Sequence, residues 1–306
     1  MIRRPPRSTL DRSSAASDVY KRQSQNFLKD GGLVDRLVEM SSIAEGELVL
    51  EIGPGKGIIT EVLLKRSGNV IAVEADRELY GALWDSYSSV SGNKPKLFNL
   101  NFLDFKLPVG GYKVFSNIPF NISADIVKRL LSANNPPKDC YLVLQKEAAE
   151  KYSGLKRESL FSILHKPFFK FSILYNFSKD DFKPSPSVDA VFLRAELLKR
   201  PLLEKGSFIL FRDFVTFGFS GTKPNLKKNF SNVFSHVQFL RLATDLKFNK
   251  DAKLTDLSFE QWLAMFEYFK ASVPADRKSK VRGAYKLLEK RQKSLDKIHR
   301  TSAGKR

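Results

Sequence analysis

A glycine loop and a spaced acid are suited to binding a nucleoside-like ligand. Residues 51–57 (EIGPGKG) place three glycines directly after a short apolar run. Glycines let the chain turn tightly and bring backbone N–H groups against a ligand at the start of a helix. Glu74 ends the next apolar run, 21 residues after Gly53, where a carboxylate can accept both hydrogen bonds from a ribose diol. Together these features predict an adenosyl ligand; separately, each is compatible with an ordinary turn or a surface charge.

Residues 117–120 (NIPF) are suited to preparing an adenine amine for reaction. This amine is a weak nucleophile because its lone pair is delocalised into the ring. Two acceptors, the Asn117 side-chain oxygen and the Ile118 carbonyl, would favour a pyramidal nitrogen that attacks a sulfonium methyl group without a general base. Pro119 fixes the turn, and Phe120 offers a face on which a flipped base can stack. Alone, the motif is also compatible with an Asn-x-Pro turn and a core phenylalanine.

A third motif, residues 182–188 (FKPSPSV), contains two prolines and predicts a stiff, extended loop before a strand. Such a loop would either line the base pocket or simply connect two elements.

A parallel sheet is expected to position these motifs. Short apolar runs predict strands over residues 47–52, 69–73, 97–100, 113–116, 140–144, 171–177 and 188–194. Apolar residues at helical spacing predict helices over residues 31–42, 58–65 and 123–132. Strands that alternate with helices are typical of an α/β domain, whose ligands bind at the carboxyl ends of the strands. The glycine loop, Glu74 and Asn117 all stand at such ends.

The pattern changes after Arg194, where no further strand is predicted. Phe-rich segments with helical spacing cover residues 207–219, 233–243 and 257–269. A chain of 306 residues is longer than one hydrophobic core usually serves. We therefore expect an α/β domain over residues 24–198 and a small all-helical domain over residues 199–270.

The composition makes several kinds of site improbable. A single cysteine, Cys140, cannot form an internal disulfide or a cysteine-based metal cluster, and three scattered histidines do not favour zinc. We expect no metal. No apolar run approaches the ~18 residues that a membrane helix needs, so we expect a cytoplasmic protein without a membrane partner.

Positive charge is concentrated at the C-terminal end. The chain has 52 Lys+Arg and 33 Asp+Glu, a net charge of +19, and residues 271–306 hold 12 basic and 3 acidic residues. Basic tails bind polyanions, chiefly nucleic acids, so this tail predicts an RNA or DNA partner. A solvated, disordered tail is the alternative, and its sparse apolar residues do not favour a membrane-surface helix.

Residues 1–23 have neither apolar periodicity nor the apolar core of a signal peptide. They resemble the in-frame translation of a sequencing-library adapter, since residues 18–23 (DVYKRQ) are what GAT GTG TAT AAG AGA CAG would encode. We expect this segment to be foreign to the natural chain and disordered; a natural disordered arm is the alternative.

In combination, the motifs resemble those of the rRNA adenine N6-dimethyltransferases, the Erm family and its relatives of the KsgA/Dim type, over about residues 24–270. Residues 24–28 (SQNFL) look like the family's N-terminal cofactor-contacting segment, and residues 182–194 look like its closing loop and strand. The resemblance implies a Rossmann-like sheet that uses S-adenosylmethionine, followed by a small C-terminal all-helical domain.

The same resemblance assigns roles to individual residues. It implies that S-adenosylmethionine is bound by Gln25, Asn26, Leu28, Gly53, Gly55, Glu74, Ala75, Asn101, Phe102 and Asn117. It implies that the target adenine is handled by Asn117, Ile118, Pro119 and Phe120.

Two positions depart from the family pattern. Asn101 stands where an aspartate usually accepts a hydrogen bond from the adenine amine of the cofactor. An asparagine oxygen can still accept one bond, without charge assistance, and Asp104 is the nearest substitute acid. Phe120 stands where tyrosine is common, which keeps the stacking face.

The motif at 117–120, with Leu257, Trp262 and Phe266, looks more like the Erm proteins than the KsgA type. Erm membership implies methylation of an adenine in 23S rRNA and resistance to macrolide, lincosamide and streptogramin B antibiotics. We expect such a chain to act as a monomer. The alternatives are a small-subunit rRNA dimethyltransferase that serves ribosome assembly, a non-catalytic nucleic-acid-binding relative and a DNA adenine methyltransferase.

Overall fold

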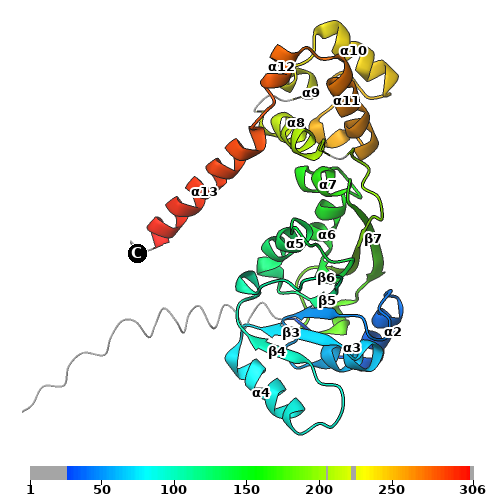
Figure 1. Cartoon of the computed structure of the whole chain (residues 1–306), viewed down its shortest axis with the longest axis vertical. Helices are drawn as coiled ribbons and strands as arrows, with labels where there is room; N and C mark the ends of the chain where they lie inside the picture. The colour runs from blue at the N-terminus through cyan, green and yellow to red at the C-terminus, as the bar shows by residue number, and fades with distance from the viewer. Residues whose placement is uncertain (1–25, 205, 222–224, 304–306) are drawn as a thin grey trace, which may run out of the picture. The chain divides into compact units, whose positions relative to one another are not determined.

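The computed structural model describes residues 26–204, 206–221 and 225–303, the last nine of them by their backbone alone. The predictions for residues 1–23 concern a segment that lies outside the described residues. The chain divides into two compact units, both visible in Figure 1. The sheet unit contains described residues up to 149 together with 170–197, and the helical unit contains 150–169 and the residues from 198 onward.

A seven-stranded sheet lies at the centre of the sheet unit, with the strand order β4-β3-β2-β5-β6-β9-β7. Its strands are β2 (Val49–Ile52), β3 (Val70–Glu74), β4 (Lys96–Asn99), β5 (Lys113–Asn117), β6 (Asp139–Gln145), β7 (Phe169–Asn176) and β9 (Ala190–Leu197). Neighbours from β4 to β6 are parallel, whereas β9 is antiparallel to β6. The predicted α/β class is confirmed. The chain leaves β2 toward β3 and returns to β5 on the other side, so ligands are expected at this switch point.

Helices connect and cover the strands of this sheet. They are α2 (Gly31–Glu39), α3 (Ile58–Ser67), α4 (Arg77–Ser88) and α5 (Ser123–Leu131). Apolar residues of α2 and α3 share one core with strand residues such as Phe115 and Phe192. The sequence pattern did not predict α4, because Leu83 is the only residue of this helix that is buried.

A second, two-stranded pairing joins distant parts of the chain. β1 (Phe27–Leu28) runs antiparallel to β8 (Phe182–Lys183). The Lys29 N–H adds a bond to the Asp181 carbonyl at 3.1 Å. The proline-containing loop predicted over 182–188 therefore begins with residues that pair with β1.

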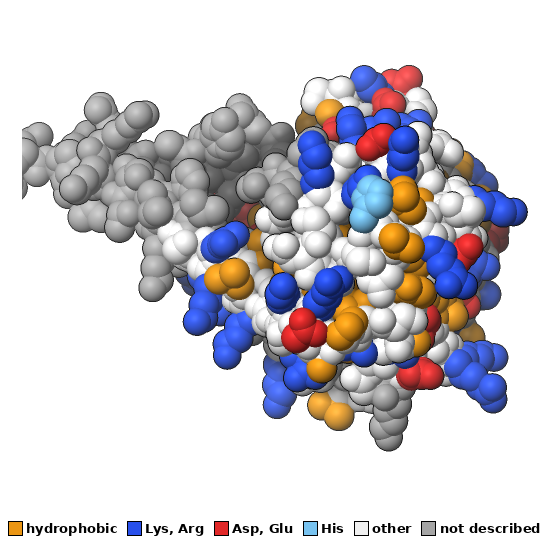
Figure 2. Space-filling model, turned by 90° about the horizontal axis from the view of Figure 1, so that it is seen from above, with side chains coloured by type: hydrophobic (Ala, Val, Ile, Leu, Met, Phe, Trp, Pro, Cys, Tyr) orange, Lys and Arg blue, Asp and Glu red, His pale blue; other side chains and the backbone are white. Residues whose placement is uncertain are grey.

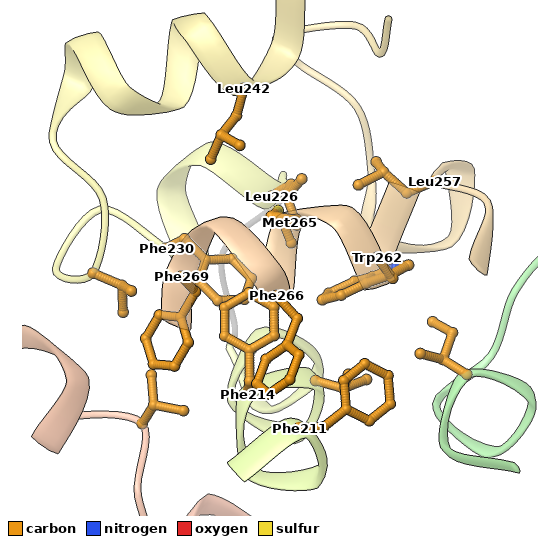
Figure 3. Packing of buried hydrophobic residues seen from close by; sticks show 14 of the residues in the cluster. Phe211, Phe214, Leu226, Phe230, Leu242, Leu257, Trp262, Met265, Phe266 and Phe269 are labelled. Carbon is orange, nitrogen blue, oxygen red and sulfur yellow. The ribbon is translucent and has the colours of Figure 1, made fainter. Parts of the chain in front are cut away.

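The helical unit is built around an aromatic core. Its helices are α6 (Lys146–Ser153, shared with the sheet unit), α7 (Leu160–His165), α8 (Phe208–Ser220), α9 (Leu226–Asn229), α10 (His236–Asp245), α11 (Phe259–Ser272), α12 (Ala275–Ser279) and α13 (Ala284–Ala303). Figure 3 shows Phe211 and Phe214 of α8 facing Trp262, Phe266 and Phe269 of α11. The Phe-rich spacing thus corresponds to helices that bury one aromatic face.

The helical unit differs from the predicted boundaries at both ends. It includes residues 150–169, because Ile163 and Leu164 of α7 belong to its core. The segment predicted as a basic tail contains α12 and α13. Figure 2 shows Lys and Arg side chains around much of the face seen from above. None of the described helices is long and apolar enough to cross a membrane.

Candidate active site

A cavity of about 590 Å³ lies at the carboxyl ends of β2, β3 and β5. Its size is typical of small-molecule sites. Every predicted site residue that the structure describes lines it: Asn26, Leu28, Gly53, Gly55, Glu74, Ala75, Asn101, Phe102, Asn117, Ile118, Pro119 and Phe120. Gln25 lies outside the described residues. The motifs are therefore brought together in one place, although they are spread over 95 residues of the sequence.

The glycine loop needs its glycines for two separate reasons. Gly53 and Gly55 have φ values of 66° and 59°, in the left-handed region that other residues rarely adopt. A Cβ added to Gly55 would also lie 2.4 Å from the ring of Phe27. The Gly53 N–H donates to the Val73 carbonyl at 2.9 Å, which ties the loop to the end of β3.

Glu74, the last residue of β3, is an acid that binds the glycine loop. Its Oε2 accepts the Gly55 N–H at 3.0 Å, and its Oε1 accepts the Asp76 N–H at 2.9 Å. Burial raises the pKa of Glu74, and these two N–H donors oppose that shift. An ionised carboxylate offers about four lone-pair sites, so two remain for the hydroxyls of a ribose.

Glu51 lies beneath the loop and plays a different part. It is 1% exposed, and its Oε2 accepts the Thr60 hydroxyl at 2.6 Å. Its Oε1 has no hydrogen-bond partner among the described residues. Burial, with the nearby Glu74, raises the pKa of Glu51 to about 8. The raised pKa of Glu51 favours its neutral form at neutral pH.

Asn101 and Phe102 form another wall of the cavity. The Asn101 oxygen accepts the Leu103 N–H at 2.9 Å and so begins the short helix η1 (Phe102–Asp104). The ring of Phe102 is buried, with the Arg129 guanidinium 5.8 Å from its centroid. Asp104 does not line the cavity, so it is not placed to substitute for the missing aspartate.

The side chain of Asn117 is held in one orientation. Its Nδ2 donates to the Asn26 carbonyl at 2.7 Å. Since only the nitrogen of the amide can donate to a carbonyl, the Asn117 oxygen is left as an acceptor. Pro119 lies against the glycine loop, because its Cδ would be 3.9 Å from a Cβ at Gly53. The amine-binding motif and the glycine loop are therefore neighbours.

The predicted Phe182–Val188 motif does not line the cavity. Its first two residues pair with Phe27 and Leu28, which do line it. The motif therefore supports Phe27 and Leu28 in the cavity wall and does not line the cavity itself.

Several lining residues were not predicted as site residues. They are Phe27, Ile52, Pro54, Ile58, Ile59, Val73, Asp76, Arg77, Glu78, Asn121 and Ile122. Asp76 caps α4 by accepting the N–H groups of Glu78 and Leu79, so recognising that helix would have indicated this part of the site. The described residues contain no group of three or more His, Cys, Asp or Glu that could hold a metal ion.

Comparisons with known proteins match residues 17–271 to the ribosomal RNA adenine dimethylase family. An rRNA adenine N-6-methyltransferase of Bacillus anthracis is 27% identical, over 79% of this chain and 84% of the relative. A ribosomal RNA small subunit methyltransferase A of Mycoplasmopsis pulmonis is also 27% identical, over 80% of this chain and 97% of the relative.

Solved structures agree with this family. The 23S rRNA methyltransferase ErmE superposes with a TM-score of 0.74 at 26% identity, covering 80% of this chain and 100% of ErmE. A dimethyladenosine transferase from Plasmodium falciparum shares the fold, with a TM-score of 0.63 at 22% identity over 80% of this chain and 98% of the other. The chain therefore belongs to the ribosomal RNA adenine dimethylase family, the S-adenosylmethionine-dependent enzymes that methylate adenine N6 in rRNA.

Proposed function

We propose that this chain methylates N6 of one adenine in the peptidyl-transferase region of 23S rRNA and thereby confers resistance to macrolide, lincosamide and streptogramin B antibiotics. The observation that carries the proposal is the likeness to ErmE, which extends over the whole of that chain. The sequence NIPF at 117–120 points the same way. We place this activity in the cytoplasm and assign it to a monomer.

The residues at the glycine loop fit S-adenosylmethionine. When bound, this cofactor supplies an electrophilic methyl group on a sulfonium sulfur. The free lone pairs of Glu74 accept from the ribose, and the backbone of Gly53 and Gly55 lets the ligand approach closely. Asn101 and Phe102 contact the adenine of the cofactor.

The residues at 117–120 receive the target adenine. The Asn117 oxygen and the Ile118 carbonyl accept hydrogen bonds from the amine, which favours a pyramidal nitrogen with an available lone pair. The Asn26 carbonyl fixes the Asn117 amide in the orientation that this task requires. Phe120 stacks on the flipped base.

RNA binding is assigned to the helical unit and to the basic C-terminal segment, which hold phosphate groups of the rRNA. An unpaired target suits this enzyme, since flipping costs least where a base is already unstacked.

A small-subunit target is the second candidate. The small-subunit methyltransferase of Mycoplasmopsis pulmonis is as similar in identity as the Bacillus anthracis relative, and 97% of its length is covered. The chemistry of the site would be unchanged, and the consequence would be in ribosome assembly rather than in drug resistance.

Methyl transfer from labelled S-adenosylmethionine to protein-free large-subunit and small-subunit rRNA tests the proposal, with Asn117→Ala as the control. Label in the large-subunit RNA that is lost in the variant is the expected result, and a resistance assay then follows. Label confined to the small-subunit RNA would favour the second candidate. RNA binding without label on either RNA would overturn both.

A further inference from the structure

The start of α13 is held by a buried acid of α8. Asp213 is 6% exposed, and its Oδ2 accepts the Gly283 N–H at 2.7 Å while its Oδ1 accepts the Tyr285 N–H at 3.1 Å. Hydrogen bonds to a carboxylate are stronger than bonds between neutral groups. If the two N–H donors were lost, the Asp213 carboxylate would be buried without these hydrogen bonds. A buried carboxylate in that state strongly destabilises the fold. Asp213 therefore attaches the start of α13 to the core helix α8.

One apolar contact and one cation–π contact complete this anchor. Val281 is fully buried in the core of the helical unit. The guanidinium of Arg212 lies 4.1 Å from the centroid of the Tyr285 ring. Beyond the anchor, α13 continues for the rest of its 20 residues, a total helical length of about 30 Å. The family match ends at residue 271, so this helix lies outside the matched residues.

Basic side chains follow one face of α13. Lys286, Lys290 and Lys293 are exposed and are spaced by four and three residues, which places them on the same side of a helix. The Arg212 guanidinium lies over one face of the Tyr285 ring, and α13 contains no Phe, Trp or further Tyr. Lysine is a point charge that suits phosphate oxygens, whereas unpaired bases are bound by aromatic faces.

We propose that α13 is a rigid basic arm that binds the phosphate backbone of a paired rRNA stem, and that Asp213 is the positioning residue that fixes the direction of the arm on α8. The inference rests on the proposed function for the choice of rRNA as the partner. A straight helix with regularly spaced charges fits the regular phosphates of a duplex, and such contacts position a protein without reading sequence.

The test compares two variants that each remove three exposed lysines. The arm variant carries K286A, K290A and K293A; the control variant carries K94A, K96A and K106A on the sheet unit. Both change the net charge by the same amount. Binding is measured by fluorescence anisotropy, as a function of salt, with labelled stem-loops from large-subunit and small-subunit rRNA and with a single-stranded oligonucleotide of the loop.

For the arm variant we expect affinity for the stem-loops to fall about tenfold or more, and the slope of log K against log salt to decrease by about two to three. Binding of the single strand should be unchanged. An unaltered salt slope, or an equal loss of affinity in the control variant, would contradict a role of α13 in binding RNA. An equal loss of affinity for the single strand would contradict a paired stem as the partner.

A double-mutant cycle tests the role of Asp213. Asp213→Asn removes the charge and leaves a single acceptor oxygen for two N–H donors. If Asp213 acts through the arm, this change weakens stem binding in the parent but adds nothing in the arm variant, and amide exchange of residues 283–290 becomes faster. Additive losses would show a general structural role and contradict the proposal.

Use of both stem-loops separates this inference from the proposed function. Phosphate contacts carry no sequence information, so the arm is expected to act on whichever stem the enzyme binds. Methylation of the small-subunit RNA would therefore overturn the 23S assignment while the effect of the arm variant persisted.

Discussion

The two units are built in different ways. In the sheet unit, polar groups gather where strands end: Glu74 is the last residue of β3 and Asn117 the last of β5, and both are oriented by backbone groups outside their strands. In the helical unit, the interior is aromatic. The ring of Phe214 lies 4.8 to 6.3 Å from five other rings, those of Phe230, Phe234, Trp262, Phe266 and Phe269.

This difference indicates that the units carry separate tasks. The proposed methyl transfer depends on loops that hold a few polar atoms in fixed directions. The stability of the helical unit depends on the volume that its aromatic rings fill. We therefore expect Phe214→Ala in the helical unit to change stability without changing the cofactor site, and Asn117→Ala in the sheet unit to change the reaction with little change in stability.

The largest effect is expected for Phe214→Ala. Removing a fully buried ring leaves a cavity and should lower the free energy of unfolding by about 3–5 kcal/mol. Calorimetry of thermal unfolding checks this value. Isothermal titration with S-adenosylmethionine below the transition should give the parent's dissociation constant, because no aromatic residue of this core lines the cavity.

Ile209→Ala is the matched control, since this residue lies on the same helix and is 65% exposed. We expect a change within about 0.5 kcal/mol. Loss of cofactor binding in the folded Phe214 variant would show that the units do not act separately.

The next effect is on the reaction itself. Asn117→Ala removes the acceptor that the Asn26 carbonyl orients, and we expect single-turnover methyl transfer to slow by about 10²–10³-fold. Asn93→Ala, on an exposed loop, is the control and should keep the parent's rate. The stability of the Asn117 variant should change little, in contrast to that of the Phe214 variant. A rate within threefold of the parent would remove Asn117 from the proposed mechanism.

The sequence predicted which residues lie together in one cavity where the motifs stand at strand ends. A short apolar run, a glycine loop and an acid at the end of the next run are all local signals, and parallel strands bring such ends together. The positions of Gly53, Glu74 and Asn117 could therefore be predicted before their contacts were known. The aromatic helices were also visible, because helical spacing of Phe is local as well.

Contacts between distant segments could not be predicted in this way. The bond from Asn117 to Asn26 joins residues 91 positions apart, and the bonds from Asp213 to Gly283 and Tyr285 span 70 and 72 positions. Nothing in the local pattern identifies these partners. The helix α4 was missed for another reason: it buries only Leu83, so its apolar periodicity is weak.

A pH-dependent effect is expected for Glu51→Gln. The unfolded carboxyl titrates at its ordinary pKa of 4.5, whereas burial raises the folded pKa to about 8. Between these values the folded chain keeps a proton that the unfolded chain releases, so the free energy of unfolding falls as the pH rises. Glutamine cannot ionise, so the variant should not lose stability in this way. Its free energy of unfolding should exceed that of the parent by up to about 3 kcal/mol at pH 7 and by almost nothing near pH 4.5.

Urea unfolding at pH 5, 7 and 8 measures this trend. Glu61→Gln, an exposed residue of α3, is the control and should leave the parent's pH trend unchanged. A Glu51 variant that is less stable than the parent at pH 8 would mean that the buried carboxyl is ionised in the folded chain.

The smallest expected effect comes from replacing single glycines by alanine. Two positions, Gly55 and Gly46, distinguish backbone strain from a change in the geometry of the site. Gly55 and Gly46 both have positive φ values, 59° and 76°, so alanine costs about 1–2 kcal/mol of strain at either position. Only at Gly55 does the added Cβ meet another group, the Phe27 ring, whereas at Gly46 nothing lies within 4 Å. Displacing Phe27 should disturb the wall of the cavity and the N–H bond to Glu74.

Gly55→Ala should therefore weaken binding of S-adenosylmethionine about tenfold or more, while Gly46→Ala keeps the parent's dissociation constant and loses only the stability that backbone strain costs. Titration calorimetry and urea unfolding on both variants give the two quantities. Because the backbone strain is the same in kind, any difference in binding belongs to what the Cβ added at position 55 meets, the Phe27 ring or the ligand itself. Equal binding by the two variants would mean that the glycine at position 55 serves the turn alone and that the cofactor does not depend on how closely β1 approaches the loop.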